Sequence, residues 1–240
     1  MTTNEQPVAI ITGAGSGVGR ALALDLAAKG YRCVLAGRTA AALDATAALL
    51  HEATPGCEAL AVPTDITDPA AAQALVDTAV ERFGRVDALA NVAGAAPLQP
   101  IPAITDDGLR ACLAVNFEAV VFLTRACWPV FEKQKQGVVV SVSSMASVDP
   151  FTGFNMYGAA KAAVNLFTKA TADEGAAIGV KAYAIAPGAI ETGMLRSVFG
   201  EDVLPRDKTL SPEQVAAVIT DCVTGETATE NGGTFVMDSP

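Results

Sequence analysis

A strand, a glycine-rich turn and a helix follow one another near the start of the chain, and this arrangement restricts the possible folds more than any other feature. Residues 8–12 are apolar and mostly β-branched. The turn GAGSGVG occupies residues 13–19, and an Ala- and Leu-rich helical pattern continues to Gly30. Glycines in such a turn let a pyrophosphate approach the amide groups at a helix N-terminus. A plain glycine-capped turn is the alternative, but the flanking strand and helix favour a dinucleotide site.

The alternation of short apolar strands with helical segments continues along the chain. Further strands are predicted near residues 33–36, 57–62, 86–92, 137–143, 180–185 and 234–237, and helices near 40–50, 69–83, 106–128, 157–178 and from Ser211 onward. Residues 193–210 have the composition of a short lid or loop. This pattern predicts an α/β fold, a doubly wound parallel sheet (Rossmann fold) of about seven strands with helices on both faces. No composition break or low-complexity segment divides the sequence, so we expect one domain over residues 1–240.

Charge and composition exclude several classes of function. The formal net charge is −10, which argues against nucleic acid and anionic membrane surfaces as partners. His51 is the only histidine, which leaves no histidine triad or multi-histidine centre, and we predict no metal site. The five cysteines are scattered, odd in number and without a CxxC pair, as expected of reduced thiols in a reducing compartment.

Targeting signals are not evident in the sequence. Residues 1–6 are polar and lack the apolar core of a signal peptide. No stretch approaches the roughly 18 consecutive apolar residues of a membrane span. We therefore expect a soluble cytoplasmic protein that does not associate with membranes.

Two of the predicted strands end in residues that bear on cofactor choice. Dinucleotide folds commonly have an acidic residue after the second strand, but this chain has Gly37 and Arg38 there. Arg38 could pair with a 2′-phosphate through its planar guanidinium, which favours NADP(H) over NAD(H). Alternatively, Arg38 stacks on adenine, which suits either cofactor. Asp65 follows the third strand, where its carboxylate could accept from the adenine amino group or simply form a turn.

Tyr157 and Lys161 form the clearest catalytic candidate. They lie four residues apart in a predicted helix and therefore share one face. A neighbouring ammonium favours phenolate, so we predict a lowered tyrosine pKa and a proton donor or acceptor usable near neutral pH. The pair alone is also typical of an ordinary helix surface. Ser143 and Ser144 end the fifth strand, where open sheets bind ligands, although one of them can be a turn serine. Asn116, inside an apolar helix, must find hydrogen-bond partners.

Taken together, these segments resemble the short-chain dehydrogenase/reductase family, in its single-domain branch. TGAGSGVG at residues 12–19 looks like the family's TGxxxGxG loop, and NVAG at 91–94 is similar to its NNAG segment, with Val92 in place of the second asparagine. Pro187, Gly188 and Thr192 resemble its nicotinamide-side loop. Four residues match its catalytic tetrad in order and spacing: Asn116, Ser144, Tyr157 and Lys161.

The resemblance implies an NAD(P)-dependent oxidoreductase that interconverts a ketone and a secondary alcohol. In this family Tyr157 would exchange a proton with the substrate oxygen, Ser144 would hydrogen-bond that oxygen, and Lys161 would lower the tyrosine pKa and hold the nicotinamide ribose. Asn116 would anchor a water in the proton path. The expected cofactor-binding residues are Gly13, Ser16, Gly17, Val18, Gly19, Arg38, Asp65, Ile66, Asn91, Ala93, Gly94, Tyr157, Lys161, Pro187, Gly188, Ile190 and Thr192.

The substrate and the assembly are less constrained by the sequence. Apolar residues in the predicted loops favour an apolar ketone or its alcohol, unless they serve packing alone: Pro97, Leu98, Met145, Phe151, Phe154, Met156, Met194 and Phe199. A carrier-linked 3-oxoacyl substrate would require a basic patch at the entrance, for which Arg196 is the lone candidate. An NAD-linked alcohol dehydrogenase and a non-catalytic dinucleotide sensor are the alternatives. The resemblance also implies a homodimer or homotetramer.

Overall fold

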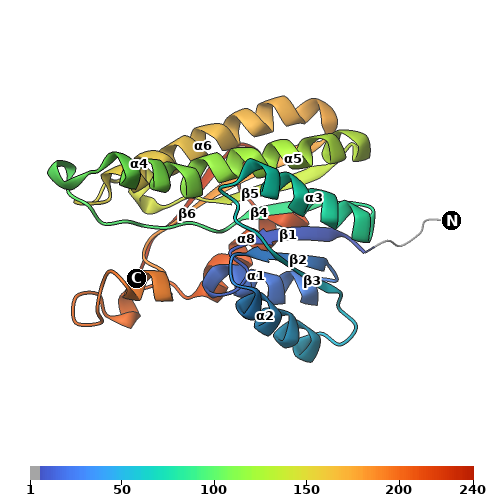
Figure 1. Ribbon diagram of the computed structural model, residues 1–240, viewed down its shortest axis with the longest axis horizontal. Helices are drawn as coiled ribbons and strands as arrows, with labels where there is room; N and C mark the ends of the chain where they lie inside the picture. The colour runs from blue at the N-terminus through green and yellow to red at the C-terminus, as the bar shows by residue number, and fades with distance from the viewer. Residues whose placement is uncertain (1–5) are drawn as a thin grey trace.

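Seven short apolar segments form one parallel sheet (Figure 1). The computed structural model describes residues 6–240, so the polar residues 1–5 lie outside the described part. The strands are β1 (Val8–Thr12), β2 (Arg32–Gly37), β3 (Ala59–Pro63), β4 (Ala88–Asn91), β5 (Gly137–Val142), β6 (Val180–Pro187) and β7 (Thr234–Met237). Their order is β3-β2-β1-β4-β5-β6-β7, and every neighbouring pair is parallel. The order reverses between β1 and β4, at the point where such sheets bind ligands. The predicted doubly wound fold is confirmed.

Helices cover both faces of the sheet and create two apolar cores. Helices α1 (Gly17–Ala28), α2 (Ala40–Ala53) and α8 (Pro212–Thr224) lie on one face, and α3 (Pro69–Phe83), α5 (Ala119–Gln134) and α6 (Asn155–Gly175) lie on the other (Figure 1). Leu22 and Ile219 are fully buried in the first core, and Leu123 and Phe131 in the second. Burial on both faces explains why the strands read as continuous apolar runs rather than as alternating patterns.

One long helical segment is interrupted by a π-helical turn. Helix α4 (Asp106–Leu113) continues through a π-helical turn (Ala114–Glu118) into α5, so the helical segment is longer than the predicted 106–128. By length and hydropathy this segment could cross a membrane, contrary to the sequence prediction. However, α5 packs against α3 and β4, and α4 packs against α6, as expected of a helix in a protein core.

Helix termini follow the signals in the sequence. The Asp68 carboxylate accepts from the Ala70 amide at the start of α3, with Pro69 as the first helical residue. Gly84 ends the same helix with φ of 78°. Ser211 and Gln214 form a reciprocal capping box at the start of α8.

The loops that follow the strands gather at one end of the sheet, at the left of Figure 1. Between β6 and α8, residues 193–210 contain only the short helix α7 (Gly193–Arg196) and the 3₁₀ turn η5 (Arg206–Lys208). Three further 3₁₀ turns are η1 (Ile101–Ala103), η3 (Met145–Ser147) and η4 (Ala176–Ile178). Of these, η3 connects β5 to the segment before α6 and therefore lies beside the catalytic candidates.

The capping box at the start of α8 predicts a measurable contribution to stability. Ser211→Ala removes the hydroxyl that accepts from the Gln214 amide, and we expect a loss of about 1 kcal/mol in the free energy of unfolding. Thr39→Ala is the matched control, because Thr39 caps α2 without a side-chain hydrogen bond and should cost less. Urea unfolding of both variants measures the difference. Equal losses would contradict the assigned role of Ser211.

Candidate active site

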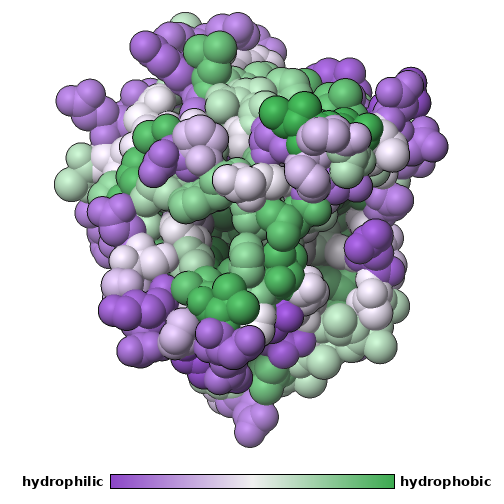
Figure 2. Space-filling model, turned by 90° about the vertical axis from the view of Figure 1, so that its left-hand side faces the viewer, coloured by the Kyte–Doolittle hydropathy of each residue, from purple (hydrophilic) through white to green (hydrophobic). Residues whose placement is uncertain are grey.

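A crevice of about 840 Å³ opens at the carboxyl ends of the strands. Figure 2 views the molecule from this end and shows a hollow bordered by apolar side chains. Most of the predicted site residues line this crevice: Gly13, Ser16, Gly17, Val18, Gly19, Arg38, Asp65, Ile66, Ala93, Gly94, Ser144, Tyr157, Lys161, Pro187, Gly188, Ile190 and Thr192. The fold thus brings together residues from almost the whole length of the chain.

Asn91 is not among the residues that line the crevice, and its role as a cofactor contact stays a prediction. Its side chain is buried in β4 and donates from Nδ2 to the Ser141 hydroxyl at 3.3 Å on the neighbouring strand β5. Asn91 is the last residue of β4, and only 3% of it is exposed. It therefore ties two strands together.

Glycines are required at the turn between β1 and α1 for two separate reasons. Gly13 and Gly17 have φ values of 66° and 50°, which side chains with a Cβ rarely adopt. At Gly19 an added Cβ would lie 2.3 Å from the Gly13 carbonyl oxygen. The absence of side chains lets α1 begin directly at the crevice, where its first amide groups can bind an anion.

Thr12 organises the loop after β4, a role that sequence reasoning missed. Its hydroxyl oxygen accepts from the Val92 amide at 2.9 Å and from the Ala93 amide at 3.1 Å. The same hydroxyl donates to the Ala90 carbonyl at 3.3 Å. The valine in place of the family's second asparagine therefore leaves both of these backbone amides hydrogen-bonded.

Asn116 sits in the π-helical turn and binds backbone groups rather than facing the crevice. Its Oδ1 accepts from the Ala95 amide at 3.1 Å, and its Nδ2 donates to the Ala95 carbonyl at 2.8 Å and to the Cys112 carbonyl at 2.9 Å. The side chain is fully buried. Since both amide hydrogens are committed, the side chain positions the loop after β4, and the expected role of Asn116 in anchoring a water stays a prediction.

Gly94 lets this loop pass between Asn116 and Lys161. A Cβ on Gly94 would lie 2.8 Å from Asn116 Oδ1 and 3.4 Å from Lys161 Nζ. Any side chain here would displace one of these two groups, so the small residue is needed for the site to form.

The two serines at the end of β5 have different roles. The Ser144 hydroxyl accepts from the Ala146 amide at 3.2 Å and hydrogen-bonds the Tyr157 side chain. The Ser143 hydroxyl donates to the Lys161 carbonyl at 3.1 Å and is buried. Ser143 is therefore the structural serine, and Ser144 is the one available to a ligand.

Close packing at the start of α6 brings Tyr157 to Ser144. An added Cβ on Gly158 would lie 2.5 Å from the carbonyl oxygen of Ala146 in η3. Only glycine permits this approach. The tyrosine therefore reaches the serine because the residue that follows it carries no side chain.

Burial sets the protonation of the tyrosine and the lysine. The Lys161 ammonium donates to the Val142 carbonyl at 2.8 Å and lies 5.8 Å from the centre of the Tyr157 ring. Burial lowers the pKa of Lys161 to about 8, which the nearby Cys112 partly opposes. The pKa of Tyr157 is raised by burial, although its hydrogen bond to Ser144 acts in the opposite direction. The predicted lowering of the tyrosine pKa is thus wrong for this geometry, because removing the phenolate from water outweighs nearby favourable groups.

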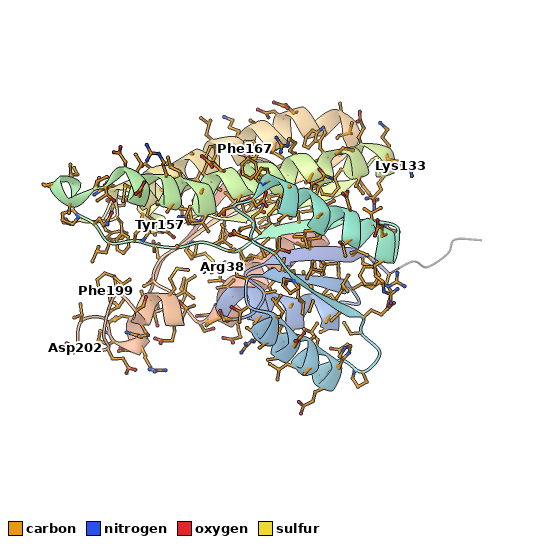
Figure 3. The ribbon with its side chains drawn as sticks, in the orientation of Figure 1. Arg38, Lys133, Tyr157, Phe167, Phe199 and Asp202 are labelled. Carbon is orange, nitrogen blue, oxygen red and sulfur yellow. The ribbon has the colours of Figure 1, made fainter. Side chains whose placement is uncertain are left out.

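Arg38 and Asp65 line the same crevice as Tyr157, and Figure 3 shows where Arg38 and Tyr157 lie. The Asp65 carboxylate accepts from the Thr67 hydroxyl at 2.7 Å and from the Thr67 amide at 3.0 Å, which is the turn-forming alternative. These bonds lower the pKa of Asp65, and the positive charge of Arg38 adds a smaller effect. Arg38 itself is exposed on the rim of the crevice.

Comparison with known proteins identifies the family. A sequence model described as short chain dehydrogenase matches residues 7–202. The chain belongs to the short-chain dehydrogenase family. It is 34% identical over 245 residues to a 3-oxoacyl-[acyl-carrier-protein] reductase of Synechocystis sp., a match that covers 97% of this chain and 98% of the relative. Relatives of this kind identify the chain as an oxidoreductase.

Solved structures of other members of this short-chain dehydrogenase family superpose closely. Levodione reductase has a TM-score of 0.91 and 29% identity, with 97% of this chain and 96% of that chain covered. A variant of actinorhodin polyketide ketoreductase with NADPH has a TM-score of 0.92 and 27% identity, with 100% and 98% covered. Both proteins are reductases by name.

Cys112 is a neighbour of the tetrad that sequence reasoning also missed. Its sulfur lies 3.6 Å from Asn116 Nδ2, and it lies near Lys161 and Tyr157, whose pKa values it tends to raise. Burial raises its pKa, so the thiol stays neutral. The four-residue spacing from Asn116 in a helix was the available signal. All five cysteines are free thiols, and each except the partly exposed Cys57 is buried.

The buried Lys161 makes a prediction about stability and pH. Its pKa in the folded state, about 8, is below the ordinary 10.5, so burial of the charged form destabilises the protein fully below pH 8 and less as pH rises toward 10.5. We expect Lys161→Met to raise the free energy of unfolding at pH 7 by roughly 1–3 kcal/mol, with a smaller gain at pH 9.5. The exposed Lys133→Met is the control. Urea unfolding at both pH values is the measurement, and a gain that does not shrink at pH 9.5 would count against the buried charge.

Proposed function

We propose that this short-chain dehydrogenase reduces an apolar ketone to a secondary alcohol with NADPH. The observation that carries the proposal is that one crevice is lined by Ser144, Tyr157 and Lys161 together with the glycine turn and Arg38. A crevice with both a proton donor and an anion-binding helix N-terminus suits a dinucleotide and a carbonyl compound together.

The residues present fit a nicotinamide dinucleotide. The cradle at Gly13, Gly17 and Gly19 would be filled by any Cβ and leaves room for a pyrophosphate against the N-terminus of α1. Thr192 and Lys161 would hold the nicotinamide end. Thr192 lies close to the glycine turn, since a Cβ added to Gly17 would lie 3.2 Å from its side chain. When bound, the cofactor supplies the hydride, and the protein supplies position and proton transfer.

Tyr157 is the proton donor in the proposed reduction. Burial keeps its phenol protonated at neutral pH, so the proton is present when a carbonyl oxygen accumulates negative charge. The Ser144 hydroxyl donates a hydrogen bond to the same oxygen. The Lys161 ammonium, mostly protonated below its pKa of about 8, stabilises the phenolate left behind.

The direction of reaction and the cofactor rest on separate observations. The protonated phenol of Tyr157 is the form that a proton donor needs in reduction, and NAD-linked alcohol oxidation is the alternative. The reductase names of the similar proteins, one of which was solved with NADPH, support the same choice. Convergence of the tetrad disfavours a non-catalytic sensor. Cytoplasmic localisation and a homodimer or homotetramer stay predictions from the sequence.

Cofactor choice is tested at Arg38. If its guanidinium pairs with the 2′-phosphate, Arg38→Ala should weaken NADPH binding about tenfold or more and change NADH binding less than about twofold. Lys29→Ala removes an exposed cation in a surface pair with Glu226 and is the control for net charge. Fluorescence titration with both cofactors gives the dissociation constants. An equal loss for NADH and NADPH would instead support stacking of Arg38 on adenine.

The proton donor is tested at Tyr157. Tyr157→Phe removes the hydroxyl and keeps the ring, so turnover of ketones should fall roughly 10²- to 10⁴-fold, while the dissociation constant of NADPH stays within about twofold. Tyr31→Phe, at a partly exposed tyrosine outside the crevice lining, is the control. Oxidation of NADPH is followed by absorbance over a panel of ketones. Unchanged turnover in Tyr157→Phe would overturn the assignment.

A further inference from the structure

The segment between β6 and α8 forms a loop with a narrow base beside the crevice. We call residues 193–210 the lid. The Glu191 amide donates to the Leu210 carbonyl at 2.8 Å, and the Leu210 amide donates to the Ala189 carbonyl at 2.8 Å. Gly193 and Met194 of the lid line the crevice, so the lid borders it. A loop of this length with little regular structure needs internal contacts to keep a single shape.

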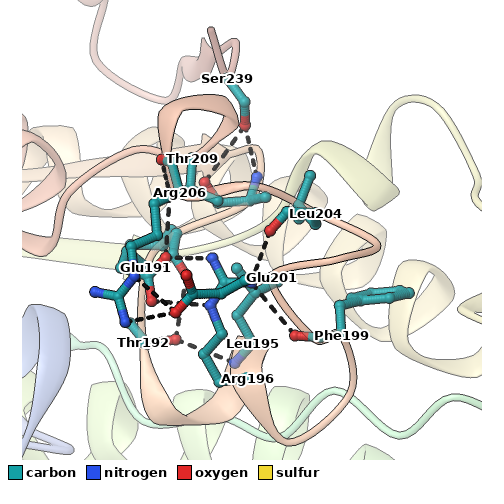
Figure 4. A network of polar contacts seen from close by, with 12 residues as sticks. Glu191, Thr192, Leu195, Arg196, Phe199, Glu201, Leu204, Arg206, Thr209 and Ser239 are labelled. Atoms are coloured by element: carbon teal, nitrogen blue, oxygen red, sulfur yellow. Dashed lines mark hydrogen bonds and ion pairs between the residues drawn. The ribbon is translucent and has the colours of Figure 1, made fainter.

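Arg196 supplies those contacts (Figure 4). Its Nε donates to Glu191 Oε1 at 2.9 Å and its Nη2 to Glu191 Oε2, a two-point pairing with the base of the lid. Its Nη1 donates to the Leu204 carbonyl at 2.7 Å and to the Phe199 carbonyl at 3.4 Å. The side chains of Arg196 and Glu191 are only 18% and 23% exposed. One guanidinium therefore connects the base of the lid to two points on its far side.

Phe199 connects the lid to the proton donor. Its ring centre lies 6.1 Å from that of Phe154, and the Phe154 ring lies 5.9 Å from that of Tyr157. Figure 3 shows Phe199 on the lid below Tyr157, at the same end of the molecule. Tilted rings at these distances are in favourable contact. The backbone carbonyl that Arg196 binds thus belongs to the residue that packs toward the reaction site.

The arginines of the lid are already neutralised. The Arg196 charge pairs with Glu191, which removes the lone candidate for binding an acyl carrier. Arg206 pairs with Glu201 at 2.7 Å on the exposed side of the lid. The exposed Lys208 is the remaining cation of the lid, but the chain carries a net charge of −10, so an anionic substrate gains little net attraction there.

We infer that Arg196 is a positioning residue that holds Phe199 beside the reaction site, and that this arrangement restricts the enzyme to compact, uncharged ketones. The inference rests on the function proposed above. Phe199 lies outside the crevice lining and packs toward Tyr157 through Phe154, so a ketone too bulky for the crevice would displace this aromatic pair and break the hydrogen bonds of Arg196 to the Phe199 and Leu204 carbonyls. A ketone with a carboxylate must leave water without a free guanidinium to receive it.

The position of the lid is tested without any substrate. Arg196→Met keeps the length of the side chain and removes its donors, and Arg206→Met makes the same change in the outer ion pair. We expect hydrogen–deuterium exchange of residues 199–204 to become at least about tenfold faster in Arg196→Met and to change less than about twofold in Arg206→Met. Equal exchange in Arg196→Met and the parent protein would overturn the positioning role, whatever the enzyme reduces.

Specificity is tested with two ketones of different size. In the parent enzyme we expect kcat/KM to be higher for cyclohexanone than for 2-decalone. Phe199→Ala and Arg196→Met should each shift this ratio toward 2-decalone by about tenfold, mainly through KM, with NADPH affinity unchanged. Phe199→Ala leaves the ion pairs intact and serves if Arg196→Met does not fold. A ratio that stays constant in Phe199→Ala would refute the size restriction.

Charge selection is tested with 4-oxopentanoate and its methyl ester. We expect the parent enzyme to favour the ester by about tenfold or more in kcat/KM. Equal rates, or a preference for the carboxylate, would overturn the restriction to uncharged ketones. Turnover of none of these ketones would contradict the proposed function, whereas the exchange experiment would still decide the role of Arg196.

Discussion

The hydrogen bond from the Lys161 ammonium to the Val142 carbonyl is the contact on which the site depends. It fixes α6 to the end of the central strand β5 and places a positive charge in the protein interior. The same ammonium restricts which residue the loop after β4 can carry, because a Cβ added to Gly94 would lie 3.4 Å from it. Burial lowers the pKa of this lysine to about 8, so the charge is retained at neutral pH but destabilises the fold. The destabilising charge is therefore the one that the proposed proton transfer would use.

The site also requires that helices approach neighbouring backbone closely, and this occurs at two places in the crevice. Gly19 meets the Gly13 carbonyl at the cofactor end, and Gly158 meets the Ala146 carbonyl at the catalytic end. In each case a helix starts against a loop at a distance that excludes any Cβ. Rigid secondary structure, rather than flexible loops, therefore carries the anion-binding amides and the tyrosine, which keeps their separation constant.

Local signals predicted the fold well, because the information lies within a few residues. The capping box at Ser211 and the cap at Asp68 involve only neighbours in sequence. The tyrosine pKa was mispredicted because it depends on burial, which no short segment encodes. The partners of Asn116 and Arg196, at Ala95 and Leu204, likewise depend on packing and could not be read from the sequence. Spacing could identify these side chains, but only the tertiary structure determines which of their donors remain available.

Arg38 and Arg196 show why it matters whether a guanidinium has free hydrogen-bond donors. Arg38 is exposed on the rim, and its nearby carboxylate, Asp65, is engaged with Thr67. Arg196 has its charge paired with Glu191 and its remaining donors bound to backbone carbonyls. A free guanidinium attracts a phosphate, whereas a paired one acts as a cross-link within the lid. Under the proposed function, the exposed Arg38 would attract an anionic cofactor, whereas the paired Arg196 would offer no free charge to a substrate.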